Sequence, residues 1–306
     1  MKKNLDLVSV IINCYNGEKY LKKAVDSVLS QTYKKIEIIF WDNRSIDKSK
    51  KIIKNYNDKR IKYFLAKKHT NLHKARNLAI EKTRGTFICF LDSDDYWSKR
   101  KIELQVKTLN KKKLNIAYGN CWLENQQTLS KKKIFSKSNL PEGNILSNIL
   151  KEYCIFLSTI MIRKQAFKKT KFKFDERYKI ISDFDLCVRL SNIWEFACVQ
   201  EPIATYRIHG KNFFIKNKLL QIRELENWYN NAKNLRYGKN IGFHNNLRYI
   251  KKKIDSLKIL KIVEEKNILI KIKKIVKDIK YSSLDFKTLV LAFCPKFILK
   301  RIMFYN

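Results

Sequence analysis

Two short acidic segments carry the residue types that can do chemistry. The segment 92–95 (DSDD) follows the apolar run 86–91, and the segment 182–185 (SDFD) precedes a helical pattern. Carboxylates at the end of a buried strand suit a hard divalent cation whose other ligands are phosphates and water. A carboxylate at a helix start can accept a proton from a hydroxyl within hydrogen-bond reach. The alternatives are a solvated acidic turn for the first segment and a simple helix cap for the second.

The elements that position these segments follow one another as a βαβ series. This alternation predicts an α/β fold, a mostly parallel central sheet with helices on both faces, followed by a helical C-terminal region. Ligands of such sheets bind beyond the carboxyl ends of the strands, where the segment 92–95 falls. We expect strands at 8–12, 36–41, 61–65, 86–91, 114–122, 155–162 and 203–207, and helices near 21–29, 52–56, 72–80, 102–109 and from Asp183 onward. The polar stretch 124–144 is expected to be a loop or hairpin.

Five segments, taken together, resemble glycosyltransferase family 2. They occur in the family's order and spacing, and the likeness covers about residues 7–210. It implies a Rossmann-like GT-A fold, a nucleotide-sugar donor, a divalent metal (manganese or magnesium) and inversion at the anomeric carbon. The segments are 8–16 (VSVIINCYN), 20–33 (YLKKAVDSVLSQTY), 37–47 (EIIFWDNRSID), 75–77 (ARN) and 85–97 (GTFICFLDSDDYW).

The resemblance also implies roles for single residues of the donor site. Asp94 would be the principal metal ligand, and Asp92 would face the metal or the ribose. The expected nucleotide-binding residues are Cys14, Tyr15, Asp42, Asn43, Arg76, Asp92 and Ser93. The chain departs from the family where Asn13-Cys14 replaces Pro-Thr or Pro-Ser, and where Asn43-Arg44 replaces Asp-Gly. The amide oxygen of Asn43 can still accept from a uracil N3–H, because Asn carries both a donor and an acceptor.

Two later motifs complete the expected site. The segment 182–190 resembles the family's Glu-Asp-x-Asp-Leu-x-x-Arg-Leu element, with Asp183 at the position of the catalytic base and Ser182 in place of the Glu. Asp185 is the next candidate for the base. The segment 206–209 (YRIH) resembles Tyr-Arg-x-His, which implies that His209 approaches the metal or the diphosphate. Arg76 could brace the acidic segment or a phosphate. The alternatives are a structural role for His209 and packing for Arg76.

Composition and charge bound the partners and the compartment. The chain has 66 basic and 28 acidic residues, a net charge of +38, which attracts polyanions or reflects coding bias. The seven cysteines are widely spaced among apolar neighbours and are expected to be reduced. No apolar run reaches the roughly 20 residues of a membrane-spanning helix, and the N-terminus does not resemble a secretory signal. We therefore expect a cytoplasmic protein.

The C-terminal part differs from the rest of the chain. We expect a catalytic domain over 1–212 and a basic helical region over 213–306. The segment 286–305 (FKTLVLAFCPKFILKRIMFY) is amphipathic and basic, which favours peripheral contact with the anionic inner face of the cell membrane. The alternative is a helix that packs on the catalytic domain.

These patterns favour an inverting, metal-dependent glycosyltransferase of bacterial surface-polysaccharide synthesis (lipopolysaccharide, capsule or a related glycan), with a glycan or lipid-linked acceptor. A nucleotidyltransferase would share the sheet and the acidic segment, but its usual Gly-rich phosphate loop is missing near the N-terminus. A nucleic-acid-binding protein without catalysis rests on charge alone, because no specific nucleic-acid-binding motif is present.

Overall fold

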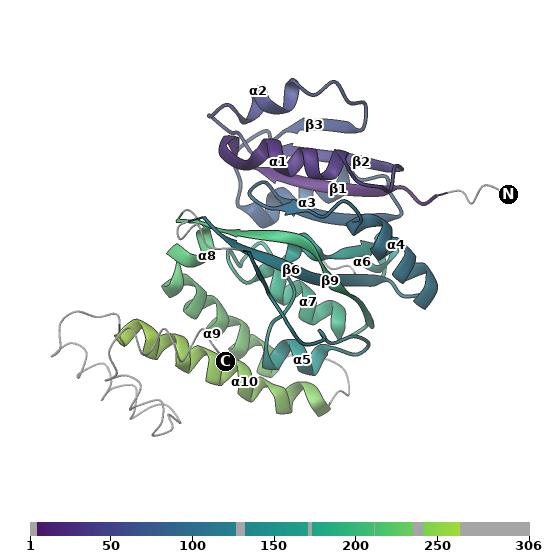
Figure 1. Cartoon of the computed structure of the whole chain (residues 1–306). Helices are drawn as coiled ribbons and strands as arrows, with labels where there is room; N and C mark the ends of the chain where they lie inside the picture. Colours follow the sequence, from purple (N-terminus) through teal and green to yellow (C-terminus); the bar gives the residue numbers. More distant parts are fainter. Residues whose placement is uncertain (1–4, 127–131, 171–172, 211, 235–240, 264–306) are drawn as a thin grey trace. The chain divides into compact units, whose positions relative to one another are not determined.

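The computed structural model describes residues 5–126, 132–170, 173–210, 212–234 and 241–263 (Figure 1). The chain divides into two compact units, Met1–Asn212 and Phe213–Asn306. The first contains β1 (Val8–Cys14), α1 (Glu18–Leu29), β2 (Ile36–Asp42), α2 (Ser49–Lys54), β3 (Ile61–Leu65), α3 (Leu72–Glu81), β4 (Phe87–Asp92), β5 (Tyr96–Trp97), α4 (Lys101–Lys112), β6 (Ile116–Asn125), β7 (Lys133–Ile134), α5 (Leu146–Lys151), the 3-10 turn η1 (Leu157–Thr159), β8 (Met161–Arg163), α6 (Lys164–Thr170), α7 (Ser182–Ser191) and β9 (Phe196–Ile208).

One sheet runs through the first unit in the order β3-β2-β1-β4-β8-β6-β9-β5, with β7 paired to β6. Strands β3, β2, β1 and β4 are mutually parallel. Because β8 is antiparallel to both β4 and β6, the long strands β6 and β9 run in the same direction as β1. Only β5, β7 and β8 run against the others in the described sheet. The expected α/β fold with a mostly parallel sheet is confirmed.

The carboxyl ends of three strands lie level in this sheet. Cys14 at the end of β1 pairs with Asp42 at the end of β2, and Asn13 pairs with Asp92 at the end of β4. In the sheet, β2 lies on one side of β1 and β4 lies on the other side, so the connections that follow β1 and β4 diverge at this edge. This is the switch point at which open α/β sheets bind ligands.

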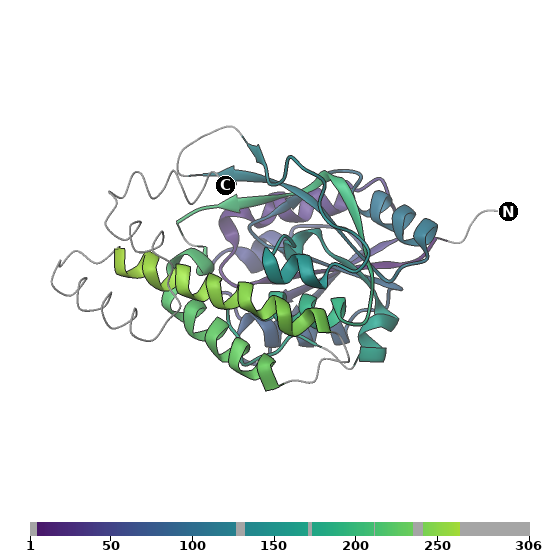
Figure 2. The same cartoon turned by 90° about the horizontal axis from the view of Figure 1, so that it is seen from below.

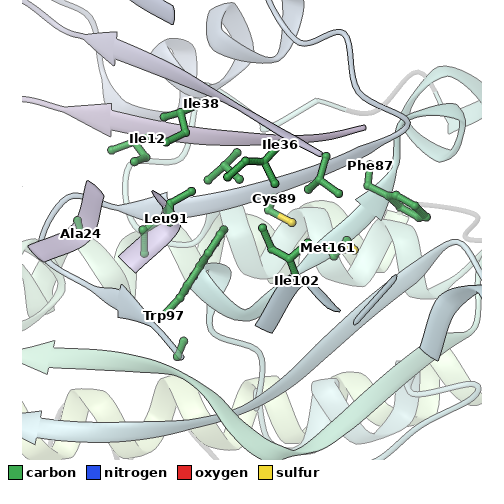
Figure 3. Packing of buried hydrophobic residues seen from close by; sticks show 14 of the residues in the cluster. Ile12, Ala24, Ile36, Ile38, Phe87, Cys89, Leu91, Trp97, Ile102 and Met161 are labelled. Carbon is green, nitrogen blue, oxygen red and sulfur yellow. The ribbon is translucent and has the colours of Figure 1, made fainter. Parts of the chain in front are cut away.

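Alternate residues of the strands pack against helices on opposite faces of the sheet. Ile12, Ile38 and Leu91 belong to a core that also includes the apolar faces of α1 and α4 (Figure 3). On the opposite face, Phe90 packs edge-on against Phe174, with ring centroids 5.3 Å apart. Helix α3 contacts β1 and β2 on that face, and Asp92 points the same way as Phe90.

The expected strand 155–162 is wrong for most of its length. Residues 157–159 form η1, and the strand β8 begins only at Met161. The hydroxyl of Thr159 donates to the carbonyl of Phe156, and Ser158 Oγ donates to the carboxylate of Asp95. Such Ser and Thr hydrogen bonds compete with strand pairing, so the chain turns toward the acidic segment instead.

The second unit, taken by itself, is helical. It contains α8 (Phe213–Lys216), α9 (Lys218–Asn234) and α10 (Ile241–Val263), and α9 packs along α10 (Figure 2). Trp228 of α9 meets Phe243 of α10 edge-on at 6.5 Å. No helix within the described residues is long and apolar enough to cross a membrane. The segment 286–305 lies outside the described residues.

The cysteines of the described residues are free and buried, as expected of reduced core residues. They are Cys14, Cys89, Cys121, Cys154, Cys187 and Cys198. Cys294 lies outside the described residues.

Candidate active site

The acidic segment forms the turn between β4 and β5. Asp92 is the last residue of β4, and the turn closes with a 3.0 Å hydrogen bond from the Asp95 backbone N–H to the Asp92 carbonyl. Asp92, Ser93 and Asp94 are half-buried, whereas Asp95 is 1% exposed. Three acidic side chains of one turn therefore meet two different environments, a solvent-facing rim and the protein interior.

A buried arginine holds the first of these carboxylates. Arg76 of α3 is 5% exposed, and its Nη2 donates to Asp92 Oδ1 at 2.5 Å. The pair crosses from α3 to the end of β4, on the same face of the sheet. Because a guanidinium donates in a fixed plane, it fixes the orientation of the carboxylate as well as its charge. The expectation that Arg76 braces the acidic segment agrees with this contact.

The second carboxylate meets the histidine that follows β9. His209 Nε2 lies 3.0 Å from Asp94 Oδ2. The imidazole stacks on the ring of Tyr20, with centroids 5.1 Å apart and planes 25° apart, and its backbone N–H donates to Asn212. Helix α1 and the segment after β9 together set the plane of His209, so two separate parts of the sequence aim its Nε2 at Asp94.

Asp95 is an internal anchor. Its carboxylate accepts from Ser158 Oγ at 2.6 Å and from the Arg207 backbone N–H at 3.0 Å. Arg207 also donates to the carbonyl of Asp94 at 2.7 Å. Burial, with the carboxylates of Asp94 and Asp92 nearby, raises the pKa of Asp95 well above its usual range. Asp95 therefore ties the acidic turn to η1 and β9.

The candidate base lies within electrostatic reach of this turn. Asp183 is the second residue of α7, and its Oδ1 accepts from the Phe184 N–H at 2.8 Å. Burial raises the pKa of Asp183 to about 6, and Asp92 adds to the rise, whereas Arg76 acts in the opposite direction. The ordinary pKa of an aspartate is about 4, so this carboxyl is tuned toward the range in which general bases work.

Tyr206 lies within electrostatic reach of both acidic segments. Burial raises the pKa of its phenol above the usual range, and Asp95, Asp94, Asp92 and Asp183 all add to the rise. Carboxylates that lie 91 residues apart in the sequence thus share one neighbourhood. The fold therefore brings the segments 92–95 and 182–185 within electrostatic reach of each other.

Asp185 has a different role from Asp183. Its Oδ2 accepts from Arg189 Nε at 2.8 Å, and Asp185 is 4% exposed. Arg189 in turn donates to the carbonyl of Lys173 at 2.8 Å. Asp185 is therefore committed to a buried ion pair within α7 and is a poor candidate for the base.

The loops after β1 and β2 interlock at the expected nucleotide site. Asn16 and Arg44 have positive φ values of 54° and 71°. A side chain at Gly17 would meet Cys14 Sγ at 2.9 Å and Ser93 Oγ at 3.0 Å, so glycine allows the start of α1 to approach the acidic turn. Backbone N–H groups of the first loop donate to side chains of the second: Asn16 to Ser45 at 3.1 Å, Gly17 to Ser49 at 3.0 Å and Glu18 to Asp47 at 2.9 Å.

Asp42 and Asn43 are buried and already hydrogen-bonded. Asp42 accepts from the Ser45 N–H and from the Tyr63 hydroxyl, both at 2.7 Å. The Asn43 amide donates to the Thr70 carbonyl at 2.7 Å, and its oxygen accepts from the Thr70 N–H and hydroxyl, both at 3.2 Å. The expected acceptance from a uracil N3–H stays a prediction, because in this structure that oxygen holds the segment after β3.

Tyr15 and His69 form the exposed edge of the same region. Tyr15 is 51% exposed, and its ring centroid lies 4.3 Å from that of His69. His69 Nδ1 lies 2.9 Å from the carbonyl of Asn43. Because a carbonyl only accepts, His69 Nδ1 is the donor in this contact. Cys14, by contrast, is 1% exposed, and burial raises the pKa of its thiol. Its Sγ accepts from Ser45 Oγ at 4.0 Å, so the thiol is engaged within the protein.

The donor set agrees with a divalent metal that takes ligands from its substrate. In the described part of the chain, no three His, Cys, Asp or Glu side chains converge on one metal position. Asp94 and His209 nevertheless offer an oxygen and a nitrogen to one place, and the Asp94 side chain is 32% exposed. Divalent ions such as Mg²⁺ are commonly bound by one or two side chains together with phosphates and water.

Sequence reasoning missed the contacts of three site residues. Tyr20 had no assigned role although it stacks on His209, and Asp95 was only one member of the acidic turn. His69 stood in a lysine-rich stretch without a motif. The ring contacts of Tyr20 and His69 join distant segments, so no local pattern reveals them.

The fold and the site define a class of enzyme. The model of the family described as "Glycosyl transferase family 2" matches residues 9–170, and the chain belongs to this family. The fold is GT-A. The mannosyltransferase PcManGT from Pyrobaculum calidifontis, solved with GDP-Man and Mn²⁺, matches with a TM-score of 0.64 and 13% identity, covering 98% of this chain and 81% of that one.

Two curated relatives are similar in sequence. The first is the Escherichia coli "UDP-Glc:alpha-D-GlcNAc-diphosphoundecaprenol beta-1,3-glucosyltransferase WfaP", 34% identical over 174 residues, which cover 56% of this chain and 67% of the relative. The second is the Methanocaldococcus jannaschii "Uncharacterized glycosyltransferase MJ1057", 30% identical over 239 residues, which cover 74% of this chain and 81% of the relative.

Proposed function

We propose that this chain is an inverting, metal-dependent glycosyltransferase that moves a sugar from a nucleotide-diphospho-sugar to a hydroxyl of a glycan or lipid-linked acceptor. The observation that carries the proposal is the geometry of the acidic turn at the end of β4, where Arg76 holds Asp92 at 2.5 Å and His209 Nε2 lies 3.0 Å from Asp94. Asp183, at the start of α7, lies within electrostatic reach of Arg76 and Asp92. A carboxylate tuned toward general-base work therefore lies beside a site suited to a diphosphate and its metal.

On the donor side, Asp94 and His209 would hold Mn²⁺ or Mg²⁺. When bound, such an ion neutralises the charge that develops on a diphosphate leaving group. Arg76 fixes Asp92 beside this place, which orients its free oxygen toward the ribose or the metal. The Mn²⁺ and GDP-Man bound by the mannosyltransferase of the same fold support this assignment.

On the acceptor side, Asp183 takes the proton from the attacking hydroxyl. With a pKa of about 6, its carboxyl is mostly ionised at neutral pH and still accepts a proton readily. Attack of that hydroxyl on the anomeric carbon, on the side opposite the diphosphate, breaks the bond to the leaving group and inverts the configuration.

The acceptor and the location follow from the relatives and the charge. The relative from Escherichia coli acts on GlcNAc-diphosphoundecaprenol, which supports a lipid-linked acceptor and a place in bacterial surface-polysaccharide synthesis. We infer a catalytic domain over 1–212 and a basic region over 213–306 that rests on the inner face of the membrane. The net charge of +38 and the exposed Arg248, Lys252 and Lys253 of α10 support an anionic surface as partner.

Two measurements test the proposal. The first is a thermal-shift panel of UDP, GDP and CDP, each with and without Mn²⁺ or Mg²⁺. One of the nucleotides should raise the melting temperature, and only when the metal is present, because ligands that bind only the folded state stabilise it. A single-stranded oligonucleotide serves as the polyanion control. Transfer is then assayed with the matching nucleotide-sugars, UDP-glucose first, and a synthetic GlcNAc-diphospholipid. A metal-independent shift equal to that of the oligonucleotide would contradict the proposal.

A further inference from the structure

Helix α3 carries a row of polar side chains on its buried face. His73, Arg76 and Asn77 are 2%, 5% and 6% exposed. Their spacing of three and four residues places them side by side on one face of the helix. Buried polar groups nearly always have hydrogen-bond partners, so this row must contact polar groups of another segment.

The partner of the row is the segment 174–179, which leads into α7. Asn77 Nδ2 donates to the Phe174 carbonyl at 2.9 Å, and Asn77 Oδ1 accepts from the Phe174 N–H at 2.9 Å. The ring of Phe174 stacks against His73, with centroids 5.7 Å apart. Ser182, the first residue of α7, donates its hydroxyl to the Asp175 carbonyl at 2.9 Å. The segment is therefore held at one end by α3 and at the other by the helix that carries Asp183.

His73 contacts both the segment 174–179 and the arginine of the acidic turn. Its Nε2 lies 3.2 Å from the Lys179 carbonyl, and its Nδ1 lies 3.5 Å from Arg76 Nη1. Because a carbonyl only accepts and a guanidinium only donates, the proton sits on Nε2 and the lone pair on Nδ1. Burial and the nearby Arg76 lower the pKa of His73 to about 3, which agrees with a neutral ring.

A continuous series of contacts results. It runs from the Lys179 carbonyl through His73 and Arg76 to Asp92, with a last step of 2.5 Å. Its first member, Lys179, lies four residues before Asp183 in the sequence, and its last member is the carboxylate at the end of β4.

We propose that His73 is a positioning residue for sugar transfer: it sets the segment that carries Asp183 relative to the Arg76–Asp92 pair. The inference rests on the proposed role of Asp183 as the base. His73 touches neither substrate, and it acts through Lys179 on one side and Arg76 on the other. Transfer depends on this spacing, because a misplacement of about 1 Å can cost roughly 100-fold in rate.

Three substitutions separate positioning from packing. In His73→Gln the terminal amide reaches about as far as imidazole Nε2 and keeps the donation to Lys179. In His73→Asn the amide ends near the place of Nδ1 and cannot reach that carbonyl. His73→Leu removes both contacts. Ile80→Ala is the matched control, because Ile80 is 7% exposed on the same helix and its loss perturbs α3 outside the row.

The full chain is assayed with UDP-glucose and a synthetic GlcNAc-diphospholipid, alongside UDP binding and hydrogen exchange of residues 174–181. We expect kcat to fall roughly 10-fold or more in His73→Asn and His73→Leu, with UDP affinity kept within about twofold, and to stay near the wild-type value in His73→Gln. Exchange of 174–181 should be faster in His73→Asn than in His73→Gln. Ile80→Ala should lower the melting temperature with kcat largely kept.

Equal kcat and equal exchange in His73→Gln and His73→Asn would overturn the proposal, as would a loss of kcat in Ile80→Ala that matches its loss of stability. Should His73→Leu fail to fold, the comparison of Gln with Asn still decides. If the synthetic acceptor supports no transfer, the hydrogen-exchange rates of residues 174–181 in His73→Gln and His73→Asn decide whether His73 holds this segment. Asp183→Asn distinguishes the two proposals: normal turnover there refutes the base, whereas lost turnover there with normal turnover in His73→Asn refutes the positioning role.

Discussion

Arg76 Nη2 lies 2.5 Å from Asp92 Oδ1, in a pair whose arginine side chain is 6% exposed and whose aspartate side chain is 34% exposed. Burial raises the pKa of Asp183, and the same guanidinium makes this rise smaller than burial alone would. One buried cation thus acts on both acidic segments. It orients a carboxylate of the donor site and keeps the candidate base ionised near neutral pH.

The pH dependence of transfer should report this arrangement. Asp183 accepts a proton only when ionised, so kcat of the wild type should be level above neutral pH and fall about tenfold per unit below its pKa of about 6. In Arg76→Met the lowering effect is lost, the pKa of Asp183 rises, and the acid limb should move to higher pH. Arg84→Met, which removes a 72% exposed guanidinium, is the control and should keep the wild-type profile. An unmoved limb in Arg76→Met would contradict the assignment.

Neighbouring aspartates of one turn should respond differently to the same substitution. Asp94→Asn should abolish metal-dependent nucleotide binding and leave the melting temperature unchanged, because Asp94 lies on the rim. Asp95→Asn should lower stability by about 1–3 kcal/mol, because the buried carboxylate accepts from both Ser158 and Arg207. Nucleotide titrations with Mn²⁺ and denaturant unfolding of both variants check this. If Asp94→Asn lost stability and Asp95→Asn lost metal-dependent nucleotide binding, the two assignments would be wrong.

The two aspartates of α7 make a second matched pair. Asp183→Asn keeps the shape of the side chain but removes proton acceptance, so transfer should fall roughly 100-fold or more while donor binding persists. Asp185→Asn removes the buried negative charge that pairs with Arg189 and should cost about 3 kcal/mol of stability. Initial rates and thermal unfolding separate the effects. Normal transfer by Asp183→Asn would show that another group is the base.

His73 should make the protein sensitive to mild acid. Its pKa is about 3 in the folded protein and about 6.5 in the unfolded chain, so below pH 6.5 the unfolded state binds a proton that the folded state does not. Stability is therefore lost as the pH falls from 6.5 toward 3, by about 2 kcal/mol between pH 6.5 and 5. His73→Gln has no imidazole to protonate, so its free energy of unfolding should fall less over this pH range. Urea unfolding of both proteins at pH 7 and 5 measures the difference, and parallel losses would refute a neutral buried His73.

The sequence predicted the positions of the acidic residues better than the side-chain contacts between distant segments. Asp92 and Asp94 follow a buried strand and Asp183 opens a helix, so local pattern and family resemblance located them. The contact of His73 with Lys179 joins residues 106 positions apart and depends on how α3 packs, which no local pattern encodes. The strand expected over 155–162 fails for a related reason, since the Ser158 hydroxyl bonds a carboxylate 63 residues away.

The basic face of α10 should bind an anionic membrane. Arg248, Lys252 and Lys253 are exposed there, whereas Lys251 and Lys258 form ion pairs with Asp255 and Glu226. Each exposed basic residue near anionic lipid contributes roughly 1 kcal/mol. Replacing the three exposed residues with Gln should therefore weaken co-sedimentation of the full chain with phosphatidylglycerol vesicles, and nucleotide binding should be unchanged.

A variant of equal charge makes this test specific. Lys50, Lys51 and Lys54 are exposed residues of α2, and their replacement with Gln removes the same number of positive charges from the first unit. Binding to the vesicles should survive in that variant, and added salt should weaken wild-type binding because it screens exposed charges. If both triple variants lose binding equally, the attraction comes from net charge alone. If neither loses it, α10 does not form the membrane-binding surface.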